Sequence, residues 1–168
     1  VVKTEKEELK GVGNSTTLPK DLDNIDEINN VLLRLSEKVG GRFRNKKQKA
    51  KTIAVEVKYN DFTKSSRQTT IDTATDSGTE IYNMVKVLFE QLWNTTPVRL
   101  LGIRTTNLLE EKEPEQLSIL DIINNQQRDA VAKPSREKME KLDKALDAIK
   151  NKYGDDAVKR ASLMKKEK

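Results

Sequence analysis

The sequence predicts an α+β fold in which a four-stranded antiparallel sheet carries two helices on one face, followed by a helical C-terminal appendage. Residues 25–43 and 81–92 place apolar side chains at helical spacing, and residues 52–59 alternate between apolar and polar side chains. The elements follow in the order β-α-β-β-α-β, and each helix has a single apolar stripe to bury. Both helices therefore cover the same sheet in a ferredoxin-like arrangement, which leaves the other sheet face open and polar.

The first part of the predicted domain is an edge strand and a long helix. Residues 10–18 form a short strand that is interrupted by Gly11 and Gly13 and ended by Pro19, as is typical of a sheet edge. Asn24 caps the helix that follows. The apolar stripe of this helix has spacings of three or four residues and consists of Ile25, Ile28, Leu32, Leu35, Val39 and Phe43.

Three more strands and a second helix complete the domain. Residues 52–59 form a half-exposed strand, and the polar residues 65–71 form a second strand that pairs with it. Residues 77–80 are a capping box that starts the second helix, which Trp93 ends as a core anchor. Residues 97–104 form the last strand, where Gly102 indicates a bulge or a close approach of another chain segment.

Composition divides the chain into four parts. Residues 1–9 form a tether, residues 10–109 the folded domain, and residues 110–133 a charged linker. Residues 134–168 form a helical tail, whose first helix ends at Tyr153-Gly154 and whose last, short helix is capped by Asp155 or Asp156. Because the first residue is Val, we expect the chain to be a piece of a longer protein.

Composition also excludes several kinds of chemistry. The sequence contains 0 Cys and 0 His, which excludes disulfides, thiol chemistry and histidine-based catalysis. No apolar run is long enough to span a membrane, so we expect no membrane partner and a cytoplasmic location. Asp72 and Asp76 precede one helix, as Asp155 and Asp156 precede another, and they are better read as caps than as metal ligands. We therefore expect no catalysis by this chain and no bound metal.

The glycine-rich start of the domain is open to two interpretations. Residues 11–16 lack the Lys of a nucleotide-binding loop and its strand–loop–helix context. The amides of a glycine-rich strand could approach a phosphate, or the glycines could be an edge irregularity.

The positive charge is concentrated in one segment. Within residues 42–67, nine basic and two acidic side chains give 9 − 2 = +7, whereas the whole chain carries +5, so the remainder carries 5 − 7 = −2. Such a patch is typical of a surface that binds a polyanion, although a solubilising face has the same composition. The basic residues are Arg42, Arg44, Lys46, Lys47, Lys49, Lys51, Lys58, Lys64 and Arg67.

The open sheet face is the preferred candidate site. Cations on its strands, beside hydroxyl and amide side chains, suit contacts with a phosphate backbone. Tyr59 alternates with the buried set, which favours backbone binding over base stacking. The residues assigned to this face are Glu56, Lys58, Ser66, Arg67, Gln68, Arg99 and Arg104.

Three segments in this order resemble one known family. They are residues 11–21 (Gly-Val-Gly-Asn-Ser-Thr-Thr-Leu-Pro-Lys-Asp), residues 59–63 (Tyr-Asn-Asp-Phe-Thr) followed by Ser66-Arg67, and residues 97–103 (Pro-Val-Arg-Leu-Leu-Gly-Ile) with Asn107-Leu108. Together they resemble the little finger domain of Y-family translesion DNA polymerases of the bacterial polymerase IV type. The resemblance covers roughly residues 9–109.

The resemblance implies a non-catalytic domain that grips a primer–template duplex through its backbones in the major groove. By matched position, Ser66, Arg67, Arg99 and Arg104 would contact phosphates, and Lys58 shares their face. The basic stretch with Arg44, Lys46 and Lys47 would border this surface. The catalytic carboxylates and their magnesium would belong to a palm domain elsewhere in a parent DNA polymerase, which would act in DNA repair at the bacterial nucleoid.

A short segment of the linker resembles the peptide by which bacterial polymerases dock on the sliding clamp. Such a segment places a glutamine in a polar subsite and apolar side chains in a cleft. Alternatively, its apolar residues pack on the domain. The segment is Gln116, Leu117, Ser118, Ile119 and Leu120.

Two other functions remain open from the residues. The basic face and the C-terminal helices could bind an acidic protein partner, which would make the chain an interaction module. The same fold could also bind RNA. We expect a monomer in either case.

Overall fold

The computed structural model describes residues 11–110 and 133–158. They belong to two compact units, residues 1–113 and residues 114–168, and each unit is described by itself. The predicted tether lies outside the described residues, as does the predicted linker apart from its two end residues.

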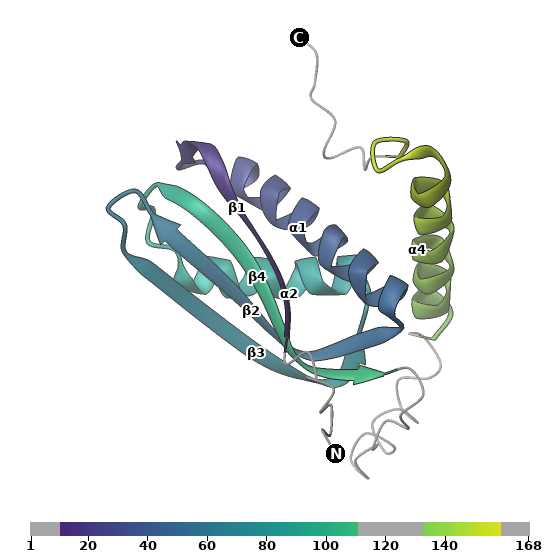
Figure 1. Ribbon diagram of the computed structural model, residues 1–168. Coiled ribbons are helices and arrows are strands. Elements are labelled where there is room, and N and C mark those ends of the chain that lie inside the picture. The colour runs from purple at the N-terminus through teal and green to yellow at the C-terminus, as the bar shows by residue number, and fades with distance from the viewer. Residues whose placement is uncertain (1–10, 111–132, 159–168) are drawn as a thin grey trace, which may run out of the picture. The chain divides into compact units, whose positions relative to one another are not determined.

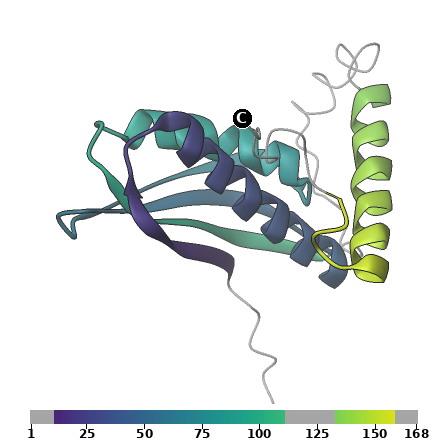
Figure 2. The ribbon, with the colours of Figure 1, turned by 90° about the horizontal axis from the view of Figure 1, so that it is seen from above.

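The described part of the first unit, residues 11–110, contains six elements in the predicted order (Figure 1). Figure 2 shows α1 and α2 on the same side of the sheet. The predicted α+β class and the β-α-β-β-α-β order are therefore confirmed. The elements are β1 (Gly11–Leu22), α1 (Ile25–Lys46), β2 (Gln48–Tyr59), β3 (Lys64–Thr75), α2 (Gly78–Leu92) and β4 (Val98–Glu110).

The strand order across the sheet is β1-β4-β2-β3, and every neighbouring pair is antiparallel. Each β-α-β unit is thus split by a strand of the other, because β4 separates β1 from β2 and β2 separates β3 from β4. The predicted edge position of the first strand is confirmed. The sheet is nevertheless a variant of the ferredoxin-like arrangement, in which the first strand is usually central.

Helix α1 begins at the predicted cap. The Asn24 side chain accepts hydrogen bonds from the backbone N–H groups of Asp26, at 2.8 Å, and Glu27, at 3.4 Å. These bonds satisfy donors that have no partner within the helix. Lys47 caps the end of the helix, and its φ of 53° lies in the left-handed region. The predicted stripe is confirmed, because Ile28, Leu32, Leu35, Val39 and Phe43 are buried.

The core lies between the two helices and the inner face of the sheet. Val55 and Val57 of β2 and Ile103 of β4 pack there against the helical stripes. Trp93 anchors the end of α2, because its ring stacks on Phe89 at 5.6 Å between ring centroids and its indole N–H donates to the Thr96 carbonyl at 2.9 Å. The tryptophan is therefore a core anchor, as predicted.

All four strands are longer than the sequence predicts, since β2 already begins at Gln48 and β3 runs from Lys64 to Thr75. β1 continues through Pro19 to Leu22, and β4 continues to Glu110. A proline removes a backbone donor, but an edge strand needs donors on one side only. The pairing register between β1 and β4 also shifts between Thr17 and Leu22, so Pro19 lies in an irregular stretch that tolerates it.

The described part of the second unit is helix α4 (Lys133–Tyr153). It ends as predicted at Gly154, whose φ is +96° and whose N–H donates to the Lys150 carbonyl at 2.8 Å. Its apolar positions Leu142 and Ile149 are exposed. The predicted last helix falls mostly on residues 159–168, outside the described residues.

Candidate nucleic-acid interface

The residues that pair between neighbouring strands show which side chains lie on the sheet face that the helices leave uncovered. One rung across the sheet consists of Ser15, Gly102, Glu56 and Ser66, in the order β1-β4-β2-β3. The next rungs are Gly13-Arg104-Ala54-Gln68 and Thr17-Leu100-Lys58-Lys64. The outermost rung pairs Gly11, Thr106, Thr52 and Thr70. Neighbouring residues such as Val55 and Ile103 point into the core, so these four rungs form the opposite surface, here called the open face.

The open face contains a shallow trough made of two adjoining hollows. The first, of about 610 Å³, lies over β1 and β4, and the second, of about 500 Å³, lies over β2 and β3. Ser15 and Glu56 line both hollows. The middle of the floor is Gly102, where an added Cβ would lie 3.1 Å from the Ser15 Cβ. The predicted close approach at Gly102 is confirmed. Because glycine has no side chain, the trough stays open at this point.

The glycines of β1 have a packing role. A Cβ on Gly11 would lie 2.6 Å from the backbone oxygen of Thr105, a distance that real Cβ atoms do not reach. Gly13 is less constrained, because its nearest neighbour, the Ile103 carbonyl oxygen, would be 3.3 Å away. Close pairing with β4 therefore explains Gly11 without a bound phosphate.

Charge on the open face is partly compensated. Arg104 donates from Nη1 to the Glu56 carboxylate at 3.3 Å, and the side chains are 65% and 43% exposed. Within residues 11–110, neither Lys58 nor Lys64 has an ion-pair partner. The Lys58 ammonium lies 4.9 Å from the centroid of the Phe62 ring. The two lysines are thus the uncompensated cations of this surface.

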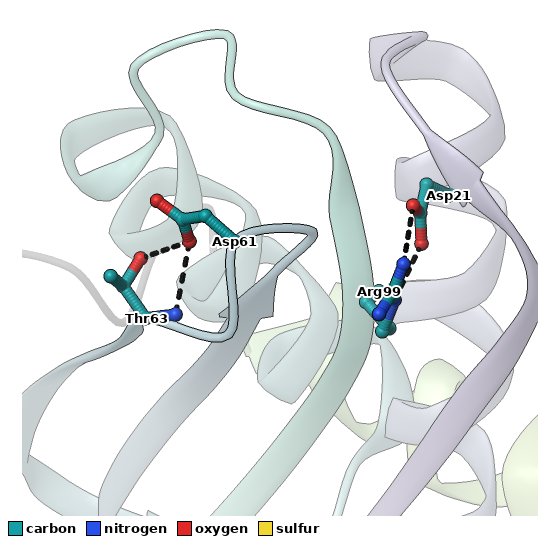
Figure 3. A network of polar contacts seen from close by, with 4 residues as sticks. All are labelled: Asp21, Asp61, Thr63 and Arg99. Atoms are coloured by element: carbon teal, nitrogen blue, oxygen red, sulfur yellow. Dashed lines mark hydrogen bonds and ion pairs between the residues drawn. The ribbon is translucent and has the colours of Figure 1, made fainter.

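Arg99 is held in a polar network at the hairpin end of the sheet (Figure 3). Its Nε and Nη2 each donate to a carboxylate oxygen of Asp21 at 3.0 Å, and its guanidinium lies 4.8 Å from the Phe62 ring centroid. These hydrogen bonds hold the pKa of Asp21 below its ordinary value and raise the pKa of Arg99. Arg99 therefore joins β4 to the end of β1. The pairing register leaves it outside the four rungs of the open face, so its predicted place on that face is not confirmed.

The hairpin between β2 and β3 presents an aromatic side chain. Phe62 has a φ of 68° and is 62% exposed. The turn is fixed by Asp61, whose carboxylate accepts from the Thr63 backbone N–H at 2.9 Å and from its hydroxyl at 2.6 Å. The Thr63 hydroxyl and N–H together lower the pKa of Asp61 (Figure 3). Phe62 was not among the predicted site residues, although its place in a hairpin turn was a signal.

The predicted place of Arg67 on the open face is wrong. Arg67 pairs with Val55, whose side chain lies in the core, so the Arg67 side chain points to the helix-covered side of the sheet. Ser66 and Gln68 lie on the open face as predicted, and Lys64 joins them there. Lys64 was predicted only as part of the basic segment, although counting back from Ser66 with a period of two places it on the open face.

The basic stretch that was expected to border the interface lies at the end of α1. Arg44 donates to the Asp76 carbonyl at 2.7 Å, which ties the helix to the β3–α2 connection. Arg42 donates to the Gly13 carbonyl at 3.1 Å and so covers part of the β1 edge. Lys46 is the last residue of the helix, and Lys47 caps it. Both arginines therefore have structural partners in the fold.

The described residues offer little else for chemistry. Residues 11–110 and 133–158 contain no group of three or more acidic side chains that could hold a metal ion. In the same two ranges, none of the helices has the length and apolar character needed to cross a membrane. The predicted clamp-binding segment, residues 116–120, lies outside the described part of the chain.

Comparison with known proteins identifies a family and its relatives. Residues 9–119 match the family model described as the impB/mucB/samB family C-terminal domain. A DNA polymerase IV of Clostridium kluyveri is 36% identical over 162 residues, which are 96% of this chain and 39% of that protein. DNA polymerase IV 1 of Bacillus subtilis is 33% identical over 161 residues, which are 95% of this chain and 36% of that protein. The chain thus spans about two fifths of the length of these relatives.

Solved structures share the fold at lower sequence identity. An insertion ternary complex of Dbh DNA polymerase aligns with a TM-score of 0.53 and 17% identity, over 60% of this chain and 29% of that one. A complex of the beta-clamp processivity factor and the little finger domain of PolIV aligns with a TM-score of 0.51 and 20% identity, over 65% of this chain and 97% of that one.

Proposed function

This chain belongs to the impB/mucB/samB C-terminal domain family, and we propose that it is the DNA-gripping domain of a Y-family DNA polymerase. The family resemblance predicted from three sequence motifs is confirmed by the family match and by the polymerase IV relatives. Catalysis, with its magnesium, would belong to another domain of the parent polymerase. The present domain would hold the primer–template duplex.

The observation that carries this proposal is the open face itself. A four-stranded sheet with one bare side presents a trough bordered by Lys58, Lys64 and Arg104, with the small Ser15 and Gly102 between them. Cations and hydroxyls on a rigid surface suit phosphate oxygens, which position DNA without reading its sequence. The aromatic side chains needed for base stacking are missing from the four rungs of the open face. A backbone grip on a duplex is therefore favoured over recognition of single-stranded RNA.

A binding assay with the 168-residue chain tests the grip. Fluorescence anisotropy with a labelled primer–template duplex is measured at 50 and 200 mM salt, beside a single-stranded RNA of the same length. We expect duplex binding that weakens steeply with salt, because phosphate neutralisation releases counterions. Absence of duplex binding at low salt and high protein concentration would refute the grip and favour an acidic protein partner for the basic face.

We also propose that residues 116–120 dock on the sliding clamp. The support comes from the sequence pattern and from the like-folded solved complex between a little finger domain and the beta-clamp. Gln116, Leu117 and Ile119 would supply the polar and apolar contacts. The test is surface plasmon resonance on immobilised sliding clamp with a Leu117→Ala, Ile119→Ala double variant. Unchanged clamp affinity in this variant would exclude the segment as the docking peptide.

A further inference from the structure

The trough contains a carboxylate that a phosphate grip does not require. Glu56 lies on β2, an inner strand of the sheet, and lines both hollows of the open face. It is the only acidic side chain in the four rungs that define this face. An anion at the centre of a surface for a polyanion opposes binding, so its presence needs a physical account.

The local geometry aims Glu56 at one cation. Arg104 pairs across the sheet with Ala54, and Glu56 pairs with Gly102, so the two charged residues are diagonal neighbours. Because Ala54 and Gly102 are small, no side chain stands between them, and the guanidinium reaches the carboxylate at 3.3 Å. Within residues 11–110, the two uncompensated lysines, Lys58 and Lys64, form no such ion pair.

We propose that Glu56 competes with the DNA backbone for Arg104 and thereby keeps the grip of the open face weak and reversible. This inference rests on the proposed function. Both side chains are substantially exposed, at 65% for Arg104 and 43% for Glu56, and exposed ion pairs of this kind are weak. A phosphate can therefore displace the carboxylate from Arg104. The displaced carboxylate stays in the trough and repels the phosphate that replaced it.

Because of this competition, the contribution of Arg104 to duplex affinity depends on the charge of Glu56. In the free chain the Arg104 guanidinium is held over the trough, where it can meet a phosphate. Its positive charge is partly neutralised by the Glu56 carboxylate, which weakens its attraction for that phosphate. Removing the Glu56 charge while keeping its shape frees Arg104 and also removes the repulsion. Duplex affinity then rises, and most of the rise depends on the presence of Arg104.

The test uses four versions of the 168-residue chain: the original, Glu56→Gln, Arg104→Gln and the double variant. Glu27→Gln is the matched control, since Glu27 also forms an exposed ion pair, with Lys20 at 3.4 Å, but lies on α1. The dissociation constant for a labelled duplex is measured by anisotropy at 50 mM salt. We expect Glu56→Gln to tighten binding about 3- to 10-fold, as removal of a nearby like charge does. The control should change it less than about 2-fold, because its charge is remote and screened.

Competition for Arg104 also predicts that the effect of Glu56→Gln depends on Arg104. In the Arg104→Gln background, the gain from Glu56→Gln should fall below about 2-fold, because the contested cation is absent. An equal gain with and without Arg104, or an equal gain in the Glu27 control, overturns the proposal. If the original chain binds the duplex but Glu56→Gln brings no gain, the inference fails while the proposed function stands. If neither binds the duplex, both fail.

Discussion

Two cations on β3 offer a sharp test of where the interface lies. Lys64 pairs with Lys58 on the open face, whereas Arg67 pairs with Val55 and points to the helix-covered side. Both side chains are exposed and lie on the same strand. Lys64→Ala and Arg67→Ala therefore remove the same charge from the same strand, but from opposite faces of the sheet.

The expected magnitude follows from the cations on the open face. Lys58, Lys64 and Arg104 are its basic residues, and each phosphate neutralised contributes about −0.9 to the slope of log affinity against log salt concentration. Three contacts give a slope of about −2.7, which is roughly a 40-fold loss of affinity between 50 and 200 mM salt. Lys64→Ala should make the slope shallower, at about −1.8, so that affinity falls only roughly 12-fold between 50 and 200 mM salt. Arg67→Ala should leave the slope near that of the original chain.

The assay is fluorescence anisotropy at four or more salt concentrations with duplexes of two unrelated sequences. Thermal melting of each variant confirms that neither alanine disturbs the fold. A shallower salt dependence for Lys64→Ala but not for Arg67→Ala, with the same change for both duplexes, supports backbone contacts on the open face. A shallower dependence for Arg67→Ala with no effect of Lys64→Ala would place the DNA on the other face and refute the reasoning.

Three further predictions concern the fold. Gly11→Ala should lower the free energy of unfolding in urea by about 1–3 kcal/mol, because its Cβ would meet the Thr105 carbonyl at 2.6 Å, and Gly13→Ala should cost less. Asn24→Ala should cost about 0.5–2 kcal/mol by removing the cap of α1, and an unchanged urea midpoint would contradict this. Arg99 lowers the pKa of Asp21, so the stability from this carboxylate is complete above its unfolded pKa of about 3.9 and is lost as pH falls through the lower folded value. Melting temperatures measured between pH 5 and 2 should therefore fall less steeply for Asp21→Asn than for the original chain.

The sequence was sufficient where a structural feature depends on a few neighbouring residues. The caps at Asn24 and Ser77 and the stripe of α1 were predicted correctly, because each follows from local spacing. The face of Arg67 was predicted wrongly for a physical reason. Residues 65–70 are polar on both sides of the strand, so no apolar alternation identifies the buried side. Only the pairing register with β2 determines which side chains share a face.

The two ion pairs made by arginines of β4 could not be predicted, because they join residues that are distant in sequence. Arg99 and Asp21 are 78 positions apart, and Arg104 and Glu56 are 48 positions apart. Their contacts depend on the strand order, which places β4 between β1 and β2. A sequence pattern identifies these four residues as charged and leaves their partners unknown.

The strand order also bears on how the proposed grip would act. β4 is central and pairs along its length with both β1 and β2, so Arg104 and Gly102 are fixed by hydrogen bonds on two sides. A surface built on doubly paired backbone cannot rearrange easily to follow a ligand. Its preference must then come from the placement of charge and from the depth of the trough, both of which are independent of base sequence. Under the proposed competition, the ion pair between Arg104 and Glu56 would lower the affinity for a duplex, which would then be held and also released. A rigid, partly neutralised surface would suit the proposed function, in which the domain holds DNA of any sequence while the duplex moves past it.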